Sequence, residues 1–124
     1  MPSHRGGCHC GRVRFEVEGE LEGLEVCNCS YCARAGYLHW YVAPERFHLR
    51  GGSDDLRSYQ FGTFSSRNHF CGVCGISPFR RPRSDPDRVD VNVRCLEGVD
   101  ADALPFRRFD GRNWEEAMRA RERG

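Results

Sequence analysis

Seven of the eight cysteines in this 124-residue chain fall into three short groups. The groups are Cys8-His9-Cys10, Cys27-Asn28-Cys29-Ser30-Tyr31-Cys32 and Cys71-Gly72-Val73-Cys74, and only Cys95 stands alone. Four thiolates close a tetrahedral zinc site, whereas three thiolates leave one coordination position open. Because seven is four plus three, the spacing indicates one closed zinc site and one open zinc site.

The two cysteine pairs are the simplest choice for the closed site. Cys8 and Cys10 would meet Cys71 and Cys74, and the ion would then staple two distant strands. Cys27, Cys29 and Cys32 would be left as the open three-thiolate set, although spacing alone leaves other pairings open. His39 and His69 are candidates for a fourth protein ligand in that set, with an ordinary core or surface position as the alternative for each.

The charge of an open three-thiolate site indicates its chemistry. Three thiolates on a divalent ion give a net charge of −1, so the ion activates water poorly compared with a three-histidine zinc. An incoming thiol suits such a soft position better, because it would be held as a thiolate nucleophile toward a small carbonyl compound. Nucleobase deaminases also use cysteine-bound zinc, but they need an H-x-E motif that none of the five histidines provides.

Cys95 has two interpretations. It follows Val89, Val91 and Val93 at alternate positions, which favours a buried, small hydrophobic residue in a strand. The alternative is a redox nucleophile.

Composition indicates a single domain over residues 1–124. The hydrophobic fraction of 39% predicts a small core that a metal would help to stabilise. All 19 basic residues are arginine, and the net charge of +1 provides no overall field for nucleic acid or a membrane. The cluster Arg80-Arg81-Pro82-Arg83 is interpreted as a solvated loop, with a phosphate or carboxylate clamp as the alternative.

Cysteine usage and hydropathy predict a cytoplasmic protein. The first residues contain no apolar signal segment, and no stretch approaches the roughly 20 apolar residues of a membrane span. In the cytoplasm thiols stay reduced, so clustered cysteines favour metal binding over a disulfide framework.

The pattern of apolar residues predicts a mainly β protein. A half-buried strand over Arg12–Val17 is expected to turn at Glu18-Gly19-Glu20 into a hairpin with Leu24–Val26. Further strands are predicted at Tyr37–Val42, Phe47–Leu49 and Val89–Cys95, and an antiparallel pair at Leu56–Phe61 and Thr63–Phe70. Pro78–Pro86 is predicted to be a loop. A short C-terminal helix, Trp114–Arg121, would begin at a capping box formed by Asn113 and Glu116.

With these motifs placed, the chain resembles the glutathione-dependent formaldehyde-activating enzyme family, which includes centromere protein V. The resemblance runs from about residue 6 to residue 116. Its matching segments are Gly7-Cys8-His9-Cys10-Gly11, Cys27–Cys32, Phe70–Ile76, Pro78–Asp87, Val91–Leu96 and Phe109–Trp114.

The resemblance implies a β-tent fold with two zinc ions. Cys8, Cys10, Cys71 and Cys74 would hold a structural zinc, and Cys27, Cys29 and Cys32 a catalytic one. The implied reaction is that of a carbon–sulfur lyase, which joins glutathione or a similar small thiol to formaldehyde or a similar carbonyl compound. Two alternatives are a non-catalytic zinc-stabilised binding module and a methionine-sulfoxide reductase-like redox enzyme that uses Cys95.

Overall fold

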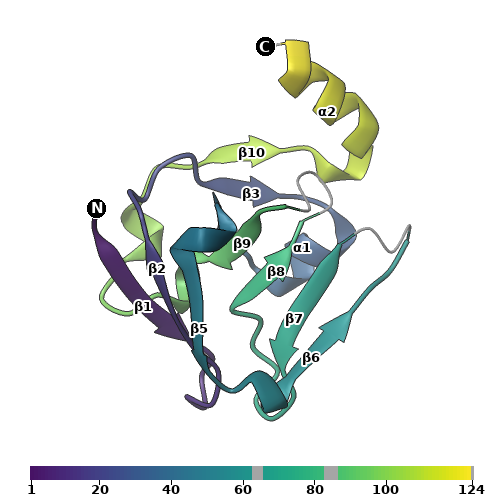
Figure 1. Ribbon diagram of the computed structural model, residues 1–124. Helices are drawn as coiled ribbons and strands as arrows, with labels where there is room; N and C mark the ends of the chain where they lie inside the picture. The colour runs from purple at the N-terminus through teal and green to yellow at the C-terminus, as the bar shows by residue number, and fades with distance from the viewer. Residues whose placement is uncertain (63–65, 83–86, 124) are drawn as a thin grey trace.

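The computed structural model of this chain describes residues 1–62, 66–82 and 87–123. Across these ranges ten strands form two sheets, which confirms the prediction of a mainly β architecture. In Figure 1 the small sheet stands on the left, and the large sheet curves from the top of the molecule down its right side. The small sheet has the order β1 (Ser3–Gly7), β2 (Arg14–Glu18), β5 (Phe47–Gly51).

The large sheet has seven strands. Their order is β10 (Arg107–Phe109), β3 (Glu25–Cys27), β4 (His39–Val42), β9 (Val89–Asn92), β8 (Phe79–Arg81), β7 (Arg67–Cys71), β6 (Leu56–Tyr59). The pair of β10 and β3 is parallel, and the other described pairs are antiparallel. The antiparallel pair predicted before and after Gly62 corresponds to β6 and β7, while residues 63–65 lie outside the described residues.

Strand β2 has the predicted alternation but not the predicted partner. Phe15 and Val17 are buried, as is Val13 just before the strand, whereas Arg14 and Glu18 are exposed. The predicted hairpin with residues 24–26 is wrong, because β2 pairs with β1 and β5 whereas β3 belongs to the large sheet. Strand β1 was not predicted, because its residues, Ser-His-Arg-Gly-Gly, have a low β propensity.

Strand β9 lies at the centre of the large sheet, between β4 and β8. All four of its residues are buried, so Asp90 and Asn92 do not face water as strict alternation would predict. The predicted strand to Cys95 ends at Asn92, whose side chain accepts a hydrogen bond from the N–H of Arg94 at 3.1 Å. The chain then makes a 3-10 turn over Val93–Cys95.

The predicted loop over residues 78–86 is wrong in part. Phe79–Arg81 form β8, which pairs with β7 and β9 inside the large sheet. Pro78 and Pro82 stand before and after this short strand, where they remove none of its own N–H donors. Residues 83–86 lie outside the described residues.

Two α-helices are described. Helix α1 (Ser30–Ala35) was not predicted; it follows Cys29 and ends at Gly36, which has the left-handed φ of 70°. Helix α2 (Trp114–Arg123) confirms the predicted C-terminal helix and projects beyond β10 (Figure 1). Asn113 belongs to the preceding 3-10 turn, where its amide donates to Asp110 at 2.9 Å. Among the described residues, no helix combines the length and apolarity that crossing a membrane requires.

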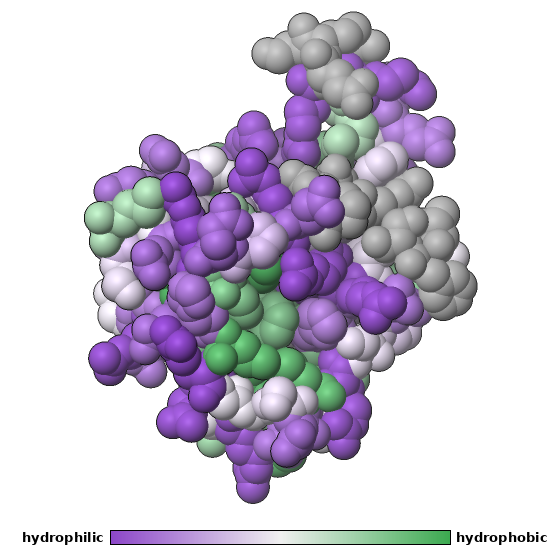
Figure 2. All heavy atoms as spheres, viewed as in Figure 1, coloured by the Kyte–Doolittle hydropathy of each residue, from purple (hydrophilic) through white to green (hydrophobic). Residues whose placement is uncertain are grey.

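The core lies where the two sheets meet. The ring of Phe47 on β5 is 5.1 Å from that of Phe15 on β2 and 4.7 Å from that of Phe79 on β8, measured between centroids. One aromatic cluster therefore draws on both sheets. On the face of the molecule seen in Figure 2, apolar residues gather between the positions that β5 and β7 have in Figure 1.

We expect Phe15→Ala to destabilise the protein by about 3–5 kcal/mol, because the ring is buried in this cluster and its loss leaves a cavity. Thermal unfolding in the presence of zinc would measure the change. Leu49→Ala is the matched control, since Leu49 lies on β5 with 37% of its surface exposed. Equal losses for the two variants would contradict this placement of the core.

Candidate functional site

A four-thiol cluster joins the turn after β1 to the turn after β7. The sulfur atoms of Cys8, Cys10, Cys71 and Cys74 all lie within 4.8 Å of one another. Two of the distances are 3.5 Å, from Cys8 to Cys10, and 3.7 Å, from Cys10 to Cys71. A disulfide needs about 2.05 Å, whereas a tetrahedral zinc with Zn–S bonds of about 2.3 Å holds its sulfur ligands roughly 3.8 Å apart. These free thiols therefore have the spacing of a metal site.

Backbone groups shape both turns of the four-thiol cluster. The N–H of Val13 donates to the sulfur of Cys8 at 3.3 Å, and the N–H of Val73 donates to the sulfur of Cys71 at 3.4 Å. Gly75 has a left-handed φ of 82° and donates to the carbonyl of Cys71, as expected for glycine beside such a turn. Burial raises the pKa of Cys8 to about 11, so a metal ion must displace a proton there.

A three-thiol cluster lies at the end of β3 and the start of α1. The sulfur atoms of Cys27, Cys29 and Cys32 lie within 4.8 Å of one another, and among the described residues no histidine or carboxylate joins them. The sulfur of Cys29 accepts the N–H of Cys32 at 3.2 Å and so caps α1. Hydrogen bonds from the Cys27 and Cys32 thiols and from the backbone lower the pKa of Cys29 to about 2. A metal ion therefore displaces a proton from Cys29 more readily than from an ordinary cysteine.

The turn that carries Asn28 is braced by residues about 80 positions later. The side-chain NH₂ of Asn28 donates to the carboxylate of Asp110 at 3.0 Å, and its side-chain oxygen accepts a hydrogen bond from the backbone N–H of Arg112 at 3.0 Å. The backbone carbonyl of Asn28 accepts a hydrogen bond from Nε of Arg112 at 2.9 Å. Gly111 lies against the thiols themselves. A Cβ atom at that position would be 2.4 Å from the sulfur of Cys27, so only glycine fits there.

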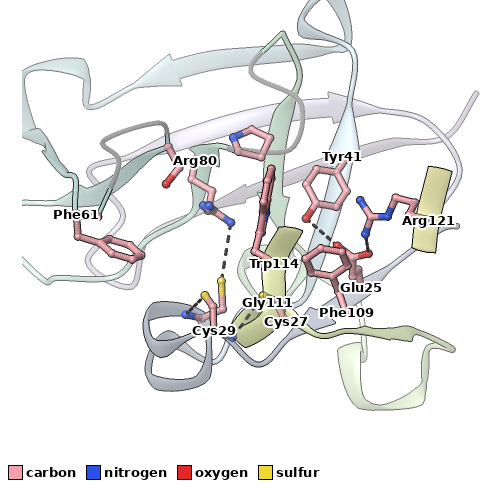
Figure 3. Close-up of a pocket in the computed structure, with 14 residues that line it drawn as sticks. Glu25, Cys27, Cys29, Tyr41, Phe61, Arg80, Phe109, Gly111, Trp114 and Arg121 are labelled. Carbon is pink, nitrogen blue, oxygen red and sulfur yellow. Dashed lines mark hydrogen bonds and ion pairs between the residues drawn. The ribbon is translucent and has the colours of Figure 1, made fainter. Parts of the chain in front are cut away.

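A pocket opens beside the three-thiol cluster (Figure 3). Its cavity is about 140 Å³, less than the roughly 300–1,000 Å³ of pockets that enclose drug-sized ligands. In Figure 3 Arg80 points toward the cysteines, and Phe61 and Phe109 lie at two ends of the pocket. Besides the three cysteines, the lining consists of Glu25, Tyr41, Phe61, Gly62, Ser66, Arg80, Pro82, Phe109, Gly111, Trp114 and Arg121. The cavity admits a small molecule, or one end of a larger one.

On one side of the pocket a buried carboxylate ties α2 to the sheet. Glu25, only 1% exposed, accepts hydrogen bonds from the hydroxyl of Tyr41 at 2.9 Å and from Nε of Arg107 at 3.2 Å. Arg121 on α2 also contacts this carboxylate and lies over the ring of Phe109, 4.3 Å from its centroid. Burial, and then the charges of Asp90 and Glu25, raise the pKa of Tyr41, so its hydroxyl stays protonated.

On the other side of the pocket lies Arg80, which is 9% exposed. Its Nη1 donates to Asp90 at 3.1 Å and lies 3.9 Å from the sulfur of Cys32. The same oxygen of Asp90 is 2.5 Å from Nδ1 of His39. This arrangement corrects the interpretation of Arg80 as part of a solvated loop. Arg83, from the same sequence cluster, lies outside the described residues.

The two histidines proposed as a fourth ligand lie elsewhere. His39 is fully buried against Asp90, and its ring stacks between those of Tyr37 and Tyr41. His69 has its Nδ1 2.9 Å from the hydroxyl of Ser58. Neither belongs to the three-thiol cluster, so the alternative of a histidine ligand does not hold.

Cys95 lies apart from the pocket. Its thiol donates to the carbonyl of Ser77 at 3.9 Å, and burial raises its pKa to about 12. Such a thiol is neutral near pH 7, which makes it a poor nucleophile. This position favours the interpretation of Cys95 as a packing residue over that of a redox nucleophile.

Sequence reasoning placed all seven clustered cysteines but missed most of the residues around them. Glu25, Tyr41 and Arg80 come from three different strands, and their meeting depends on sheet order, which local patterns do not show. Asp90 offered one signal, because an acidic residue between two valines of a central strand needs a partner.

Two comparisons with known proteins agree with this geometry. Residues 3–107 match the model of the family described as glutathione-dependent formaldehyde-activating enzyme. The fold is similar to that in a crystal structure of a Rhodobacter sphaeroides protein solved as a structural genomics target. The similarity to that protein has a TM-score of 0.78 and 36% sequence identity, and covers 84% of this chain and 98% of the other.

We expect Gly111→Ala to disrupt the three-thiol cluster, because the added methyl group would overlap the sulfur of Cys27. Mass spectrometry of metal-free, reduced protein should show faster alkylation of Cys27 and Cys29. Gly23→Ala is the control: it introduces a side chain at a φ of 68°, which is strained, but meets no atom within 4 Å. Unchanged alkylation in Gly111→Ala would contradict the packing described.

We expect Cys95 in native protein to resist alkylation by iodoacetamide at pH 8. A pKa raised to about 12 keeps this thiol protonated until the pH approaches that value, and its side chain is largely covered. Peptide mapping would show modification only after denaturation. Rapid labelling of the native protein at pH 8 would restore the redox interpretation.

Proposed function

Because this chain belongs to the glutathione-dependent formaldehyde-activating enzyme family, we propose that it is a zinc-dependent carbon–sulfur lyase. It forms or cleaves an adduct between a small thiol, glutathione or a similar molecule, and a small carbonyl compound such as formaldehyde. The observation that carries this proposal is a three-thiol cluster that opens onto a pocket and that no further ligand from the described residues completes.

In this proposal each thiol cluster holds one zinc ion. Thiolates select zinc by softness and geometry, and the spacing of the sulfur atoms fits such an ion in both clusters. Cys8, Cys10, Cys71 and Cys74 form a closed, structural site. Cys27, Cys29 and Cys32 form the catalytic site, whose remaining position is accessible from the pocket. A cytoplasmic location fits the free thiols, which must stay reduced to bind metal.

Zinc at the three-thiol cluster would hold the incoming thiol as a thiolate at neutral pH. The chain supplies the surroundings of that nucleophile. Phe61, Phe109 and Trp114 give the cavity apolar walls that limit the water around the thiolate. A cavity of about 140 Å³ leaves room for a small carbonyl compound, so the body of a tripeptide thiol has to lie outside.

Two other functions fit the arrangement less well. A non-catalytic binding module would have a saturated second site, whereas His39 and His69 both lie away from the three-thiol cluster. A methionine-sulfoxide reductase-like reaction would need a reactive Cys95, which is largely buried with a raised pKa. The partners proposed are therefore small molecules, with no nucleic acid or membrane among them.

The activity test measures adduct formation between glutathione and formaldehyde above the uncatalysed rate. We expect Cys29→Ala to reduce the excess rate to background, because it removes a catalytic ligand. Cys95→Ala should retain it, since Cys95 does not line the pocket. If wild-type protein shows no excess rate with any small thiol and aldehyde, the enzyme proposal fails.

Counting zinc per chain tests the metal assignment separately from activity. With reducing agent present, elemental analysis should find about two zinc ions in wild-type protein and about one in Cys29→Ala. Cys71→Ala should lose the structural ion and with it much of the thermal stability. A wild-type protein that contains no metal would overturn both assignments.

A further inference from the structure

Addition of a thiolate to a carbonyl compound moves negative charge onto the carbonyl oxygen. The carbon–sulfur bond forms while the C=O π bond breaks, and the π electrons go to oxygen. The resulting alkoxide takes a proton from water, which replaces the proton the thiol lost on binding. Hydrogen-bond donors fixed around that oxygen stabilise the transition state. A donor for this role must lie in the pocket and close to the three-thiol cluster.

Two arginines of the described chain line the pocket, and each is paired with a buried carboxylate. Arg121 contacts the carboxylate of Glu25 and stacks on Phe109, so its guanidinium is committed to these two residues. It also lies on the side of α2, next to Glu25, in Figure 3. Arg80 instead points toward the cysteines, with Nη1 3.9 Å from the sulfur of Cys32.

The side chain of Arg80 is held in place by buried residues of strands β9 and β4. Asp90 is fully buried on the neighbouring strand β9 and accepts from Nη1, and Asp90 is itself held by His39 on β4. A guanidinium carries five N–H donors, and both of the contacts just named use Nη1. Since Arg80 lines the pocket, N–H donors of its guanidinium that these two contacts leave over can face a ligand that accepts hydrogen bonds.

We propose that Arg80 is a catalytic residue whose guanidinium binds the oxygen of the carbonyl compound as negative charge develops there. The inference rests on the proposed lyase function and assigns the electrophile to the Arg80 side of the pocket. Asp90 and His39 are positioning residues that fix the guanidinium before the substrate arrives. Because the donors are already oriented, little reorganisation accompanies the reaction.

The kinetic test compares Arg80→Gln with Arg81→Gln in the zinc-loaded protein. Loss of one such donor typically lowers kcat about 10²–10³-fold, and we expect a loss of that size in Arg80→Gln. Arg81→Gln, the neighbour on β8 that does not line the pocket, should stay near the wild-type rate. Both variants should keep two zinc ions per chain. Wild-type kcat in zinc-loaded Arg80→Gln overturns the role of Arg80 and leaves the lyase proposal intact.

A binding measurement tests Arg80 independently of turnover. Sodium formate, a carboxylate close in size to formaldehyde, is titrated into wild-type and variant protein by calorimetry. We expect formate affinity to fall at least about tenfold in Arg80→Gln, which is a typical effect of losing a charge-assisted hydrogen bond. It should be unchanged in Arg81→Gln. Equal formate affinities in wild type and Arg80→Gln overturn the proposal, even if adduct formation has not been detected.

Two further variants keep the proposal testable if Arg80→Gln fails to fold. Removing one partner of a buried ion pair leaves the other charge uncompensated. The double variant Arg80→Gln with Asp90→Asn removes both charges and should show the same loss of kcat. Arg80→Lys keeps the charge but not the planar fork, so a merely electrostatic role would preserve kcat whereas oxygen binding by the guanidinium predicts a loss.

Discussion

The gathering of Cys8, Cys10, Cys71 and Cys74 is the constraint on which the rest of the structure depends. It joins the turn of the small sheet to an end of the large sheet, at the edge of a core built from rings of both. With 39% hydrophobic residues the chain has little apolar surface to hold two sheets together. In the proposed metal-bound state, four zinc–thiolate bonds at this junction add to the packing and fix how the sheets meet.

The three-thiol cluster is positioned by other means. Its sulfur atoms are placed by the end of β3, the first turn of α1 and the brace from Asp110 and Arg112, so no further protein ligand is needed for its shape. Around it two buried carboxylates hold arginine side chains. Arg107 and Arg121 share Glu25 on the side of α2, whereas the guanidinium of Arg80 faces the thiols with Asp90 behind it. Both arginines that line the cavity are thus paired with a carboxylate, and Arg80 is the one that lies against the thiols.

Local sequence patterns predicted the features that are encoded locally. The simplest pairing of the cysteine groups matches both clusters, and alternation placed Phe15 and Val17 on the buried face of β2. The same reasoning missed β1 and β8, because glycines and flanking prolines masked strands whose stability comes from their neighbours. Arg80 was assigned to a solvated loop for the same reason. Its burial depends on Asp90, which reaches it only through the pairing of β8 and β9.

The hydrogen bonds between Asn28 and residues 110–112 hold the three-thiol cluster in shape but are not part of the core, so the site can be less stable than the fold. Strand β10, which leads into that brace, is three residues long, has β3 as its single partner among the described strands and lies at an edge of the sheet. Edge segments of this kind open locally at a lower free-energy cost than the whole molecule. We therefore expect mild heating to detach this segment and distort the pocket while the two sheets persist, so a melting curve alone would overestimate the temperature range over which the three-thiol cluster keeps its shape.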